Sequence, residues 1–404
     1  MRIVVAFPGS VETAPAWFLH WLDGLAPHIE CVVATDQGER YSRHAYAVHP
    51  QNGSALGRAA GWISPRLSLR LQASYMHRRY RPALVQACFL DHAARWCSAL
   101  PAAVPLVASG YGFDIFAAPI RFPARRHSYL ELFRRCRLLW SPSPLTDEAI
   151  CRLGCPEDKS RVLRLGVPPG SPRERPWSPA EPIRVLIAGR YQGKKGIADC
   201  LQVATREARN SKLEVTLIGW SQRGGEAEAA AVEAEVVELS RVATVRRLPR
   251  LDYQRFAAEL RSQDIYLGGH RVAADGDAEG GYPIIVLEAA AAELVIVTRP
   301  HGEIPSILRD GVDCFLSLDD SVDALSGAFR SAIEARARWP AIGRSARNIV
   351  VAKFDASTLG VQFAALFQEV ASGRTSDSAR NQKADRPKTE DPNQKPRLKT
   401  SEGS

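Results

Sequence analysis

Short runs of aliphatic and β-branched residues alternate with stretches of helical period along the second half of the chain. The strand-like runs are IRVLIAG, LEVTLIG, ATVRRL, DIYLGG, LVIVT and CFLSL. The helical stretches include KKGIADCLQVATREA, EAEAAAVEAEVVELSRV, LDYQRFAAELRS, PIIVLEAAAAE and SVDALSGAFRSAIEARA. Strand runs that are almost continuously apolar are buried on both faces, as in a parallel sheet covered by helices. The pattern therefore predicts an α/β fold with a doubly wound parallel sheet.

The first half of the chain repeats this alternation more loosely. Its clearest strand-like runs are RIVVAF, IECVVAT, PLVASG and LLWSPS. Between the halves, residues 166–182 hold six prolines in 17 positions, which is typical of a linker. With 404 residues, the chain is long enough for two domains. We expect two Rossmann-like domains facing a cleft, and a ligand at the carboxyl ends of their strands.

The last residues of the chain change character. Residues 371–404 hold a single large aliphatic residue, Leu398, and four of the nine lysines. Such a segment cannot bury enough apolar surface to fold, so we expect a disordered tail. The expected units are an N-terminal domain at 1–168, a linker at 169–182, a C-terminal domain at 183–354, a final helix at 355–370 and the tail at 371–404.

The composition is that of a soluble globular protein, with 45% apolar and 24% charged residues. No stretch of about 20 apolar residues lacks charges, so no membrane-spanning helix is expected. The opening MRIVVAF reads as a first β-strand, because neither a long apolar region nor a cleavage site of a signal peptide follows it. Eight scattered cysteines without a CxxC pair predict a reduced, cytoplasmic protein without structural zinc.

The net charge of +9 is unevenly distributed. Residues 66–82 hold five arginines and one histidine, and residues 121–137 hold six arginines. Such stretches meet phosphates or anionic lipid, or they are simply solvated helix faces. No nucleic-acid-binding motif accompanies them, so no nucleic-acid partner is expected.

The first chemical signal is AGRYQGKKG, at residues 188–196. Arg190 stands at the end of a predicted strand, and Lys195 stands where the next helix begins. Two cations and the free N–H groups of a helix start suit a diphosphate. The stretch is neither a P-loop nor a dinucleotide fingerprint, because both glycine patterns are incomplete. An exposed basic turn is the alternative interpretation.

The second signal is EGGYPIIVLE, at residues 279–288. Glu279 lies in a loop, Gly280 and Gly281 allow backbone N–H groups to approach a ligand, and Pro283 is expected to begin a helix. Glu288 then falls in the second turn of that helix. An ionised carboxylate only accepts hydrogen bonds, so two of them suit a ribose diol and a sugar hydroxyl. A capping Glu279 and an Arg-paired Glu288 are the structural alternative.

Together these signals describe a sugar-nucleotide pocket, and they resemble a known family. GRYQGKKG resembles the G-R-x-x-x-x-K-G motif of retaining GT-B glycosyltransferases, the group called family 4. DGDAEGGYPIIVLEAAAAELVIVT resembles their E-x7-E segment, and HGEIPSILRDGVDCFLS the stretch after it. The likeness is to bacterial exopolysaccharide and colanic-acid-type transferases. It covers nearly everything except the tail, most strongly residues 184–318.

The resemblance implies the GT-B fold, a final helix that crosses back to the N-terminal domain, and retaining sugar transfer from a nucleotide-diphosphate sugar. It implies that Arg190 and Lys195 bind the diphosphate, that Glu288 binds the ribose and that Glu279 contacts the donor sugar. In such transferases the leaving phosphate takes the acceptor proton, so no protein base is demanded. The catalytic candidates are Glu279, Arg190 and Lys195; the donor-binding candidates are Arg190, Lys195, Gly280, Gly281, Glu288 and His301.

The chain also departs from the family pattern. Eight residues separate Glu279 from Glu288, where seven are usual. In the second half, Glu293, Val295 and Ser306 replace a usual Gly, Pro and Glu. In the first half, Tyr111 replaces a His before GFD, and Gln86 and Cys88 replace a His-x-His pair. The acceptor side is therefore atypical, and its candidates are Tyr111 and Asp114.

Asp275 and Asp277 form an Asp-x-Asp pair, which binds a metal in a different glycosyltransferase fold. Here Arg190 and Lys195 already neutralise phosphate, so we expect a hydrogen-bonded loop in which Asp277 accepts N–H groups, and no metal or other cofactor. His301 is expected at the same edge, where it contacts donor phosphate or plays a structural role.

Three hypotheses follow. The first is a transferase that acts on a glycan or lipid-linked acceptor in polysaccharide or cell-surface glycan synthesis, located in the cytoplasm or peripherally on the inner face of the plasma membrane. The second is a nucleotide-sugar epimerase of the same fold, against which the scarcity of His in the first half argues. The third is a non-catalytic accessory protein that retains the donor pocket. The sugar, the nucleotide base, the acceptor and the oligomeric state are not determined by the sequence.

Overall fold

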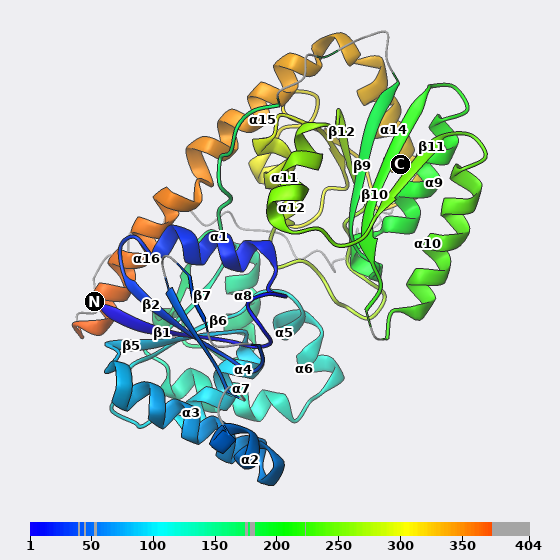
Figure 1. Ribbon diagram of the computed structural model, residues 1–404. Helices are drawn as coiled ribbons and strands as arrows, with labels where there is room; N and C mark the ends of the chain where they lie inside the picture. The colour runs from blue at the N-terminus through cyan, green and yellow to red at the C-terminus, as the bar shows by residue number, and fades with distance from the viewer. Residues whose placement is uncertain are drawn as a thin grey trace, which may run out of the picture.

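The computed structural model of the chain describes residues 1–38, 41–43, 46–51, 55–173, 177, 182–222 and 224–373. These residues form two α/β domains, each built on its own sheet, with the N-terminal domain below the C-terminal one in Figure 1. The expected tail lies outside the described residues from position 374 onward.

The sheet of the N-terminal domain has the order β3-β4-β2-β1-β5-β6-β7-β8 within the described residues. Its pairs are parallel except for the edge pair of β3 and β4, which is antiparallel. The strands are β1 (Arg2–Phe7), β2 (Glu30–Thr35), β3 (Tyr41–Arg43), β4 (Tyr46–Pro50), β5 (Leu84–Cys88), β6 (Leu106–Ser109), β7 (Leu138–Ser141) and β8 (Ser160–Val162). The helices are α1 (Ala16–Leu25), α2 (Ala55–Ile63), α3 (Pro65–Tyr80), α4 (Leu90–Ala99), α5 (Phe113–Phe116), α6 (Ala118–Arg121), α7 (Arg125–Arg135), α8 (Pro144–Arg152) and the 3₁₀ turn η1 (Glu157–Lys159).

The sheet of the C-terminal domain is parallel and has the order β11-β10-β9-β12-β13-β14 within the described residues. Its strands are β9 (Ile183–Arg190), β10 (Leu213–Trp220), β11 (Thr244–Leu248), β12 (Ile265–Gly268), β13 (Val295–Thr298) and β14 (Phe315–Leu316). The helical segments are η2 (Gly193–Lys195), α9 (Ile197–Glu207), α10 (Glu226–Leu239), α11 (Tyr253–Arg261), α12 (Ile284–Ala291), α13 (Ile304–Ile307), α14 (Val322–Glu334), η3 (Arg336–Arg338), α15 (Trp339–Lys353) and α16 (Ala356–Ala371). The predicted α/β fold with two parallel sheets is confirmed.

Successive side chains of a strand point to opposite faces of the sheet. Helices cover both faces of each sheet, so both sets of side chains are buried. In β1, Ile3 and Val5 pack with α1 and α16, whereas Val4 and Ala6 pack with α3, α4 and α7. The C-terminal sheet is covered in the same way, by α9, α10 and α14 on one face and by α12 and α15 on the other. This double burial accounts for the continuously apolar strand runs.

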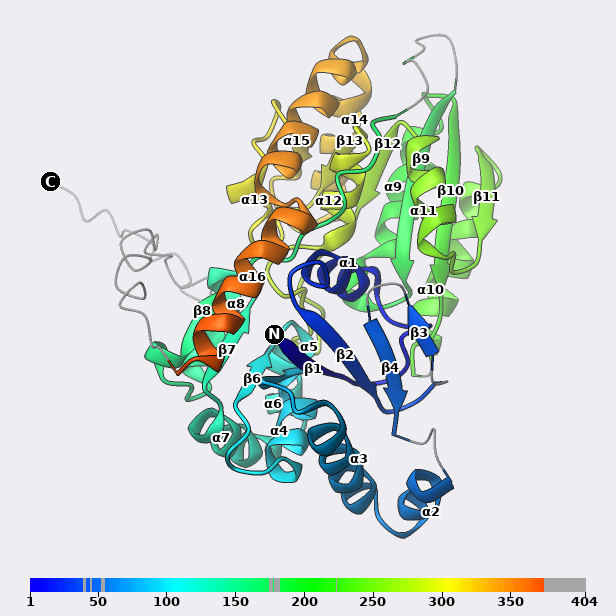
Figure 2. The ribbon, with the colours of Figure 1, turned by 60° about the vertical axis from the view of Figure 1, so that its left-hand side comes forward.

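The last helix leaves the C-terminal domain and packs on the N-terminal one, as Figure 2 shows for α15 and α16. Asp355 caps α16 by accepting hydrogen bonds from the N–H groups of Ser357 and Thr358 at 3.2 Å. Phe363 then stacks edge-on against Trp140 at 4.8 Å, within the core of the N-terminal domain. Residues 355–371 therefore bind the two domains together.

Two further features are relevant to the function. All eight cysteines lie in described parts of the chain, and all are free thiols. No helix among the described residues combines the length and the apolar character that crossing a bilayer requires.

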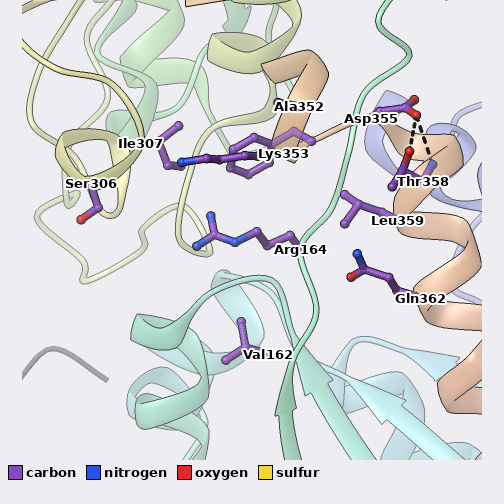
Figure 3. Close-up of a pocket in the computed structure, with 11 residues that line it drawn as sticks. Val162, Arg164, Ser306, Ile307, Ala352, Lys353, Asp355, Thr358, Leu359 and Gln362 are labelled. Carbon is purple, nitrogen blue, oxygen red and sulfur yellow. Dashed lines mark hydrogen bonds between the residues drawn. The ribbon is translucent and has the colours of Figure 1, made fainter. Parts of the chain in front are cut away.

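A pocket of about 360 Å³ lies where the segment after β8, the end of α15 and the start of α16 meet (Figure 3). Arg164 and Lys353 reach into it, and Arg164 lies 3.7 Å from the carboxylate of Glu303. Ser306 also lines this pocket, but Arg190, Lys195, Glu279, Glu288 and His301 do not. The site predicted from the sequence is elsewhere, at the carboxyl ends of the C-terminal strands.

Candidate active site

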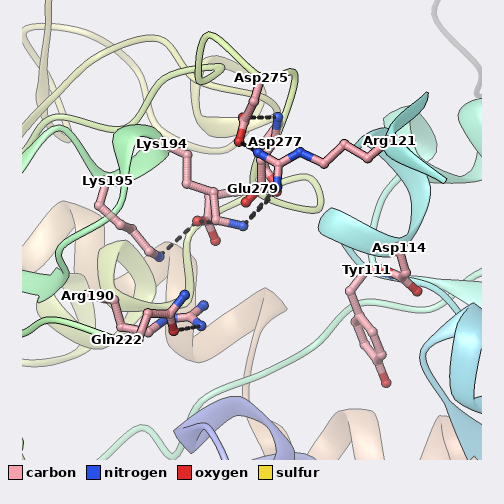
Figure 4. Close-up of polar contacts among 11 residues, drawn as sticks. Tyr111, Asp114, Arg121, Arg190, Lys194, Lys195, Gln222, Asp275, Asp277 and Glu279 are labelled. Carbon is pink, nitrogen blue, oxygen red and sulfur yellow. Dashed lines mark hydrogen bonds and ion pairs between the residues drawn. The ribbon is translucent and has the colours of Figure 1, made fainter. Parts of the chain in front are cut away.

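Arg190 is the last residue of β9, and η2 begins three residues later, at Gly193. Its Nη1 donates to Gln222 Oε1 at 3.3 Å from an exposed position (Figure 4). Gly196 then turns the chain into α9 with φ +57°, and a Cβ at this position would lie 2.1 Å from Gly269 O. Only glycine tolerates both the positive φ and this contact. The turn is thereby held against the end of β12, which brings Lys195 toward the loop that follows that strand.

Lys195 and Glu279 form an ion pair, with Lys195 Nζ 2.9 Å from Glu279 Oε1 (Figure 4). Their side chains are only 15% and 16% exposed. Burial by itself would raise the pKa of Glu279, but the ammonium groups of Lys195 and Lys194 outweigh it and hold that pKa well below its usual range. Burial in turn lowers the pKa of Lys195. Glu279 is therefore an anion among cations at neutral pH.

Lys194 is a further buried cation of the site that sequence reasoning passed over. Its Nζ lies 3.0 Å from Asp277 Oδ1 and 3.8 Å from Glu279 Oε1, and it donates to Ala278 O at 3.4 Å. A lysine is rarely this buried without a charged partner. The signal available in the sequence was the Lys-Lys pair before Gly196, of which the motif uses only the second member.

The two carboxylates of the Asp-x-Asp pair make different contacts. Asp277 accepts from the Lys194 ammonium, whereas Asp275 Oδ1 accepts from the backbone N–H of Asp277 at 2.9 Å. Asp275 also forms an ion pair with Arg121 of α6, which crosses to the N-terminal domain. Within the described part of the chain, no three His, Cys, Asp or Glu side chains are grouped so that they could hold a metal ion.

Glu288 lies in the second turn of α12, as expected, but Pro283 is the N-cap and Ile284 the first helical residue. The residue is only 6% exposed. Its Oε1 lies 3.1 Å from Nε2 of His20, a residue of α1 in the N-terminal domain. The ring of Tyr253 in α11 contacts the His20 ring edge-on at 4.3 Å. No motif in the sequence pointed to His20 as the partner of Glu288.

Two histidines flank the cluster of Glu279, Lys194 and Lys195. His270 follows β12, and its Nε2 is 2.8 Å from the hydroxyl of Tyr266. Burial and the Lys195 charge hold the pKa of His270 well below its usual range. His301 follows β13, and burial also lowers its pKa although the Glu279 charge opposes this. Both rings are therefore neutral at pH 7, and a neutral ring can donate as well as accept. His301 was a sequence candidate, whereas His270 was not.

Gly280 and Gly281 lie in the loop between β12 and α12, which we call the donor loop, at the point where it meets the N-terminal domain. A Cβ at Gly280 would lie 2.1 Å from Tyr111 O, and a Cβ at Gly281 would lie 2.3 Å from Ser143 Cβ. Gly281 also has φ +106°. The two glycines therefore have a structural role, which is to allow the two domains to approach. Their predicted role of bringing N–H groups to a ligand stays a prediction.

Tyr111 points into the N-terminal domain, away from Glu279 (Figure 4). Its hydroxyl lies 2.9 Å from Ser109 Oγ, which accepts from Gln86 Nε2 at 2.9 Å, and Gln86 Oε1 accepts from Trp140 Nε1. Cys88 lies beside this series of hydrogen bonds, and burial raises the pKa of its thiol to about 12. The residues that replace the family's histidines thus form one buried polar network.

Asp114 is also buried. Its carboxylate accepts from the backbone N–H groups of Leu90 at 2.9 Å and Tyr111 at 3.1 Å. Burial raises the pKa of Asp114 to about 6, although these hydrogen bonds oppose the shift. Asp114 therefore fixes the Tyr111 loop and the start of α4, and the predicted acceptor-side role of both residues stays a prediction.

Residues 173–348 match the family model described as glycosyl transferases group 1. This part of the chain is similar to a glycosyltransferase group 1 domain. The matched region contains all seven donor-side candidates, which are Arg190, Lys195, Glu279, Gly280, Gly281, Glu288 and His301.

Two similar proteins are named as glycosyltransferases of polysaccharide synthesis. The amylovoran biosynthesis glycosyltransferase AmsK of Erwinia amylovora is 25% identical over 65% of this chain and 63% of its own length. The putative colanic acid biosynthesis glycosyltransferase WcaL of Escherichia coli K12 is 28% identical over 59% of this chain and 58% of its own length. The chain thus spans less than two thirds of these relatives. Neither they nor the family model favours the epimerase or the accessory hypothesis.

The likeness in structure covers more of the chain. The crystal structure of Anabaena HepE in complex with UDP-glucose superimposes with a TM-score of 0.70, at 17% identity, over 91% of this chain and 100% of HepE. At this identity the likeness concerns the fold. Together with the two parallel-sheet domains it confirms the GT-B architecture that the motifs implied.

Proposed function

We propose that this protein is a glycosyltransferase that moves a sugar from a nucleotide-diphosphate sugar to a glycan or lipid-linked acceptor, with retention of the anomeric configuration. The observation that carries the proposal is the convergence of Arg190, Lys195 and Glu279 at the carboxyl ends of the C-terminal strands. The group 1 domain, the polysaccharide-synthesis relatives and the UDP-glucose complex of HepE support it.

The diphosphate of the donor would be bound by Arg190 and Lys195. The Arg190 guanidinium is exposed and makes one hydrogen bond, to Gln222, so it can turn toward a phosphate. An ammonium group has three N–H donors, so Lys195 can contact a phosphate oxygen while it keeps its pair with Glu279. The charges of Glu279 and Lys195 both shift the pKa of His301, so its ring lies near this ion pair. Its neutral ring would donate a hydrogen bond to the same diphosphate.

Glu288 would accept hydrogen bonds from the ribose hydroxyls, and Glu279 from the donor sugar near the reacting carbon. In the transfer step, the bond between the anomeric carbon and the phosphate oxygen breaks and the acceptor oxygen bonds to that carbon on the same face. The acceptor proton passes to the departing phosphate. The protein contributes positioning and the stabilisation of phosphate charge by its cations. We propose that these cations replace a metal, so transfer should persist in EDTA.

The first experiment is a thermal-shift panel of nucleotide sugars with the full chain, because a bound donor raises the melting temperature by mass action. Calorimetry with the matching nucleoside diphosphate then separates the roles. Glu288→Gln and Arg190→Ala should weaken binding about tenfold or more, because each loses a charge-assisted contact. Glu279→Gln should leave binding within about threefold and lower turnover instead.

The matched control is Arg184→Ala, at the amino end of the same strand β9, where the guanidinium pairs with Glu214 at 3.6 Å. It removes the same charge from the opposite edge of the sheet and should leave nucleotide binding unchanged. If no nucleotide sugar shifts the melting temperature, the proposed function is wrong. Binding without any transfer would instead favour a non-catalytic role.

The acceptor side includes a surface suited to a membrane, which we call the α2–α3 surface. Its apolar members are exposed, with Trp62 93% and Ile63 77% exposed at the end of α2. Along α3 two rows run side by side, each with a spacing of four residues. One row is apolar and the other is mostly basic. The exposed residues of the two rows are Leu67, Leu71 and Tyr75, and Arg66, Arg70 and Arg78.

Apolar side chains that enter a bilayer beside arginines that contact headgroup phosphates are typical of helices that lie in a membrane interface. We propose that the α2–α3 surface places the protein on the anionic inner face of the plasma membrane, where a lipid-linked acceptor would be presented.

A further inference from the structure

His20 lies on the face of α1 that points away from the core of its own domain. Phe18 and Leu22 of the same helix pack into that core. Each residue of an α-helix advances by about 100°, so His20 is rotated by roughly 200° from Phe18. A histidine in this position is ordinarily exposed to water. Here it is only 3% exposed.

The burial of His20 comes from the C-terminal domain. Glu288 of α12 and Tyr253 of α11 contact the imidazole from that domain, at 3.1 Å between Nε2 and Oε1 and at 4.3 Å between ring centroids. Figure 1 shows α1 at the top of the N-terminal domain, facing α11 and α12. The contact joins residues 268 positions apart in the sequence.

The same segment of the N-terminal domain is held at a second point. Arg250 Nη2 of the C-terminal domain donates to the carbonyl oxygens of Thr13 at 3.0 Å and Ala14 at 3.1 Å, just before α1 begins. Two points therefore hold α1 against the C-terminal domain. One is the contact of His20 with Glu288, and the other is the pair of hydrogen bonds from Arg250. His20 is consequently presented to Glu288 in a defined position.

We propose that His20 is a positioning residue for Glu288, which holds the ribose-binding orientation of that carboxylate only while the two domains are docked. The inference rests on the proposed function, in which Glu288 binds the ribose. A carboxylate has two oxygens and about four lone-pair sites. A hydrogen bond from His20 to Oε1 therefore fixes the plane of the group and leaves Oε2 able to accept from a ribose hydroxyl.

Coupling between domain docking and nucleotide binding follows from this arrangement. If the domains separate, Glu288 loses its donor and is free to rotate away from the ribose. Linkage is reciprocal, so a bound nucleotide that needs the oriented carboxylate favours the docked state by the same factor. His20, which never contacts the nucleotide in this proposal, would nevertheless set its affinity.

The test compares four full-length variants with the unmodified protein by calorimetry with UDP, GDP, ADP and dTDP in turn. They are His20→Phe, His20→Gln, Glu288→Ala and the double variant of Glu288→Ala with His20→Phe. His20→Phe keeps a ring against Tyr253 but removes the donor, whereas His20→Gln puts an amide N–H near the place of Nε2. We expect His20→Phe to weaken nucleoside diphosphate binding about tenfold, and His20→Gln to stay within about threefold of the unmodified protein. In a Glu288→Ala background, His20→Phe should change binding by less than about twofold, because the residue acts through Glu288.

Several results would overturn the inference. They are unchanged or tighter binding by His20→Phe, failure of His20→Gln to restore binding, and a full additional loss from His20→Phe in the Glu288→Ala background. Should His20→Phe not fold, His20→Asn is the substitute, because its amide is too short to reach Glu288. If the unmodified protein binds none of the four nucleotides, the proposed function fails and the inference fails with it; this outcome is recognised from the unmodified protein alone.

Discussion

Lys195 Nζ lies 2.9 Å from Glu279 Oε1. The motifs nevertheless assign the two residues to different parts of the donor, Lys195 to the diphosphate and Glu279 to the sugar. Each side chain therefore already has a partner before a ligand binds. The pair places the group that would contact the sugar next to the group that would contact the leaving phosphate. Because the ion pair requires an ionised Glu279, the free energy of unfolding also depends on the protonation state of this carboxyl group.

The first prediction concerns pH. The pKa of Glu279 in the folded protein lies below its ordinary value of 4.5, so its contribution to stability is present above that pH and is lost as the pH falls below it. Glu279→Gln removes this contribution, and it should lower the free energy of unfolding at pH 7 by about 1–3 kcal/mol because Lys195 loses its partner.

Urea unfolding at several pH values between 7 and 3 measures the effect. The unmodified protein should lose stability more steeply below pH 4.5 than Glu279→Gln does. Parallel curves for the two proteins would mean that Glu279 has an ordinary pKa and that the ion pair does not form in solution.

The second prediction concerns the contact between the domains. Gly280→Ala introduces a Cβ that would lie 2.1 Å from Tyr111 O, so the donor loop must move away from the N-terminal domain. We expect a loss of roughly 1–3 kcal/mol in the free energy of unfolding, as for other overpacked sites. Chemical unfolding monitored by circular dichroism measures it.

The matched control is Gly327→Ala in α14, where a Cβ would meet nothing within 4 Å. This change should be neutral or stabilise the protein by up to about 1 kcal/mol, since alanine favours a helix. Equal stability of Gly280→Ala and the unmodified protein would show that the loop is not packed on Tyr111 in solution.

The third prediction concerns Tyr111. Its hydroxyl bonds to Ser109 inside the N-terminal domain, so Tyr111→Phe should cost about 1 kcal/mol of stability and leave turnover within about twofold. Thermal unfolding and a transfer assay with the donor found in the panel measure the two quantities. A large loss of turnover at unchanged stability would instead assign the hydroxyl to the acceptor.

The fourth prediction concerns the α2–α3 surface. Replacing Arg66 and Arg70 by serine should weaken binding to vesicles with anionic lipid by about 2 kcal/mol, or roughly thirtyfold, at low salt. Trp62→Ser should weaken binding at low and high salt alike, because it removes apolar contact. Co-sedimentation with anionic and neutral vesicles provides the measurement.

The charge-matched control replaces Arg241 and Arg255, two exposed arginines of the C-terminal domain, by serine. This variant should bind vesicles like the unmodified protein. Indifference of all the proteins to anionic and neutral vesicles would leave the arginines of α3 as a solvated helix face.

The sequence by itself determined the fold class, the two domains and most of the strands of the C-terminal sheet, because local apolar runs and helical periods are properties of short segments. It also selected Arg190, Lys195, Glu279 and Glu288, because each stands in a local motif. It gave no clear signal for β5, in which Gln86 interrupts the apolar run, or for α15.

Only the tertiary structure decided which partners these residues take. Arg190 and Lys194 are four residues apart, yet the first makes a solvent-exposed hydrogen bond to Gln222 at the end of a strand and the second is buried against Asp277. Glu288 was predicted from its helix, but its partner His20 comes from the other domain. Pairing over such distances depends on how whole domains pack, and no periodicity or short motif encodes it. The positions of the charges were therefore predictable from the sequence, and their contacts were not.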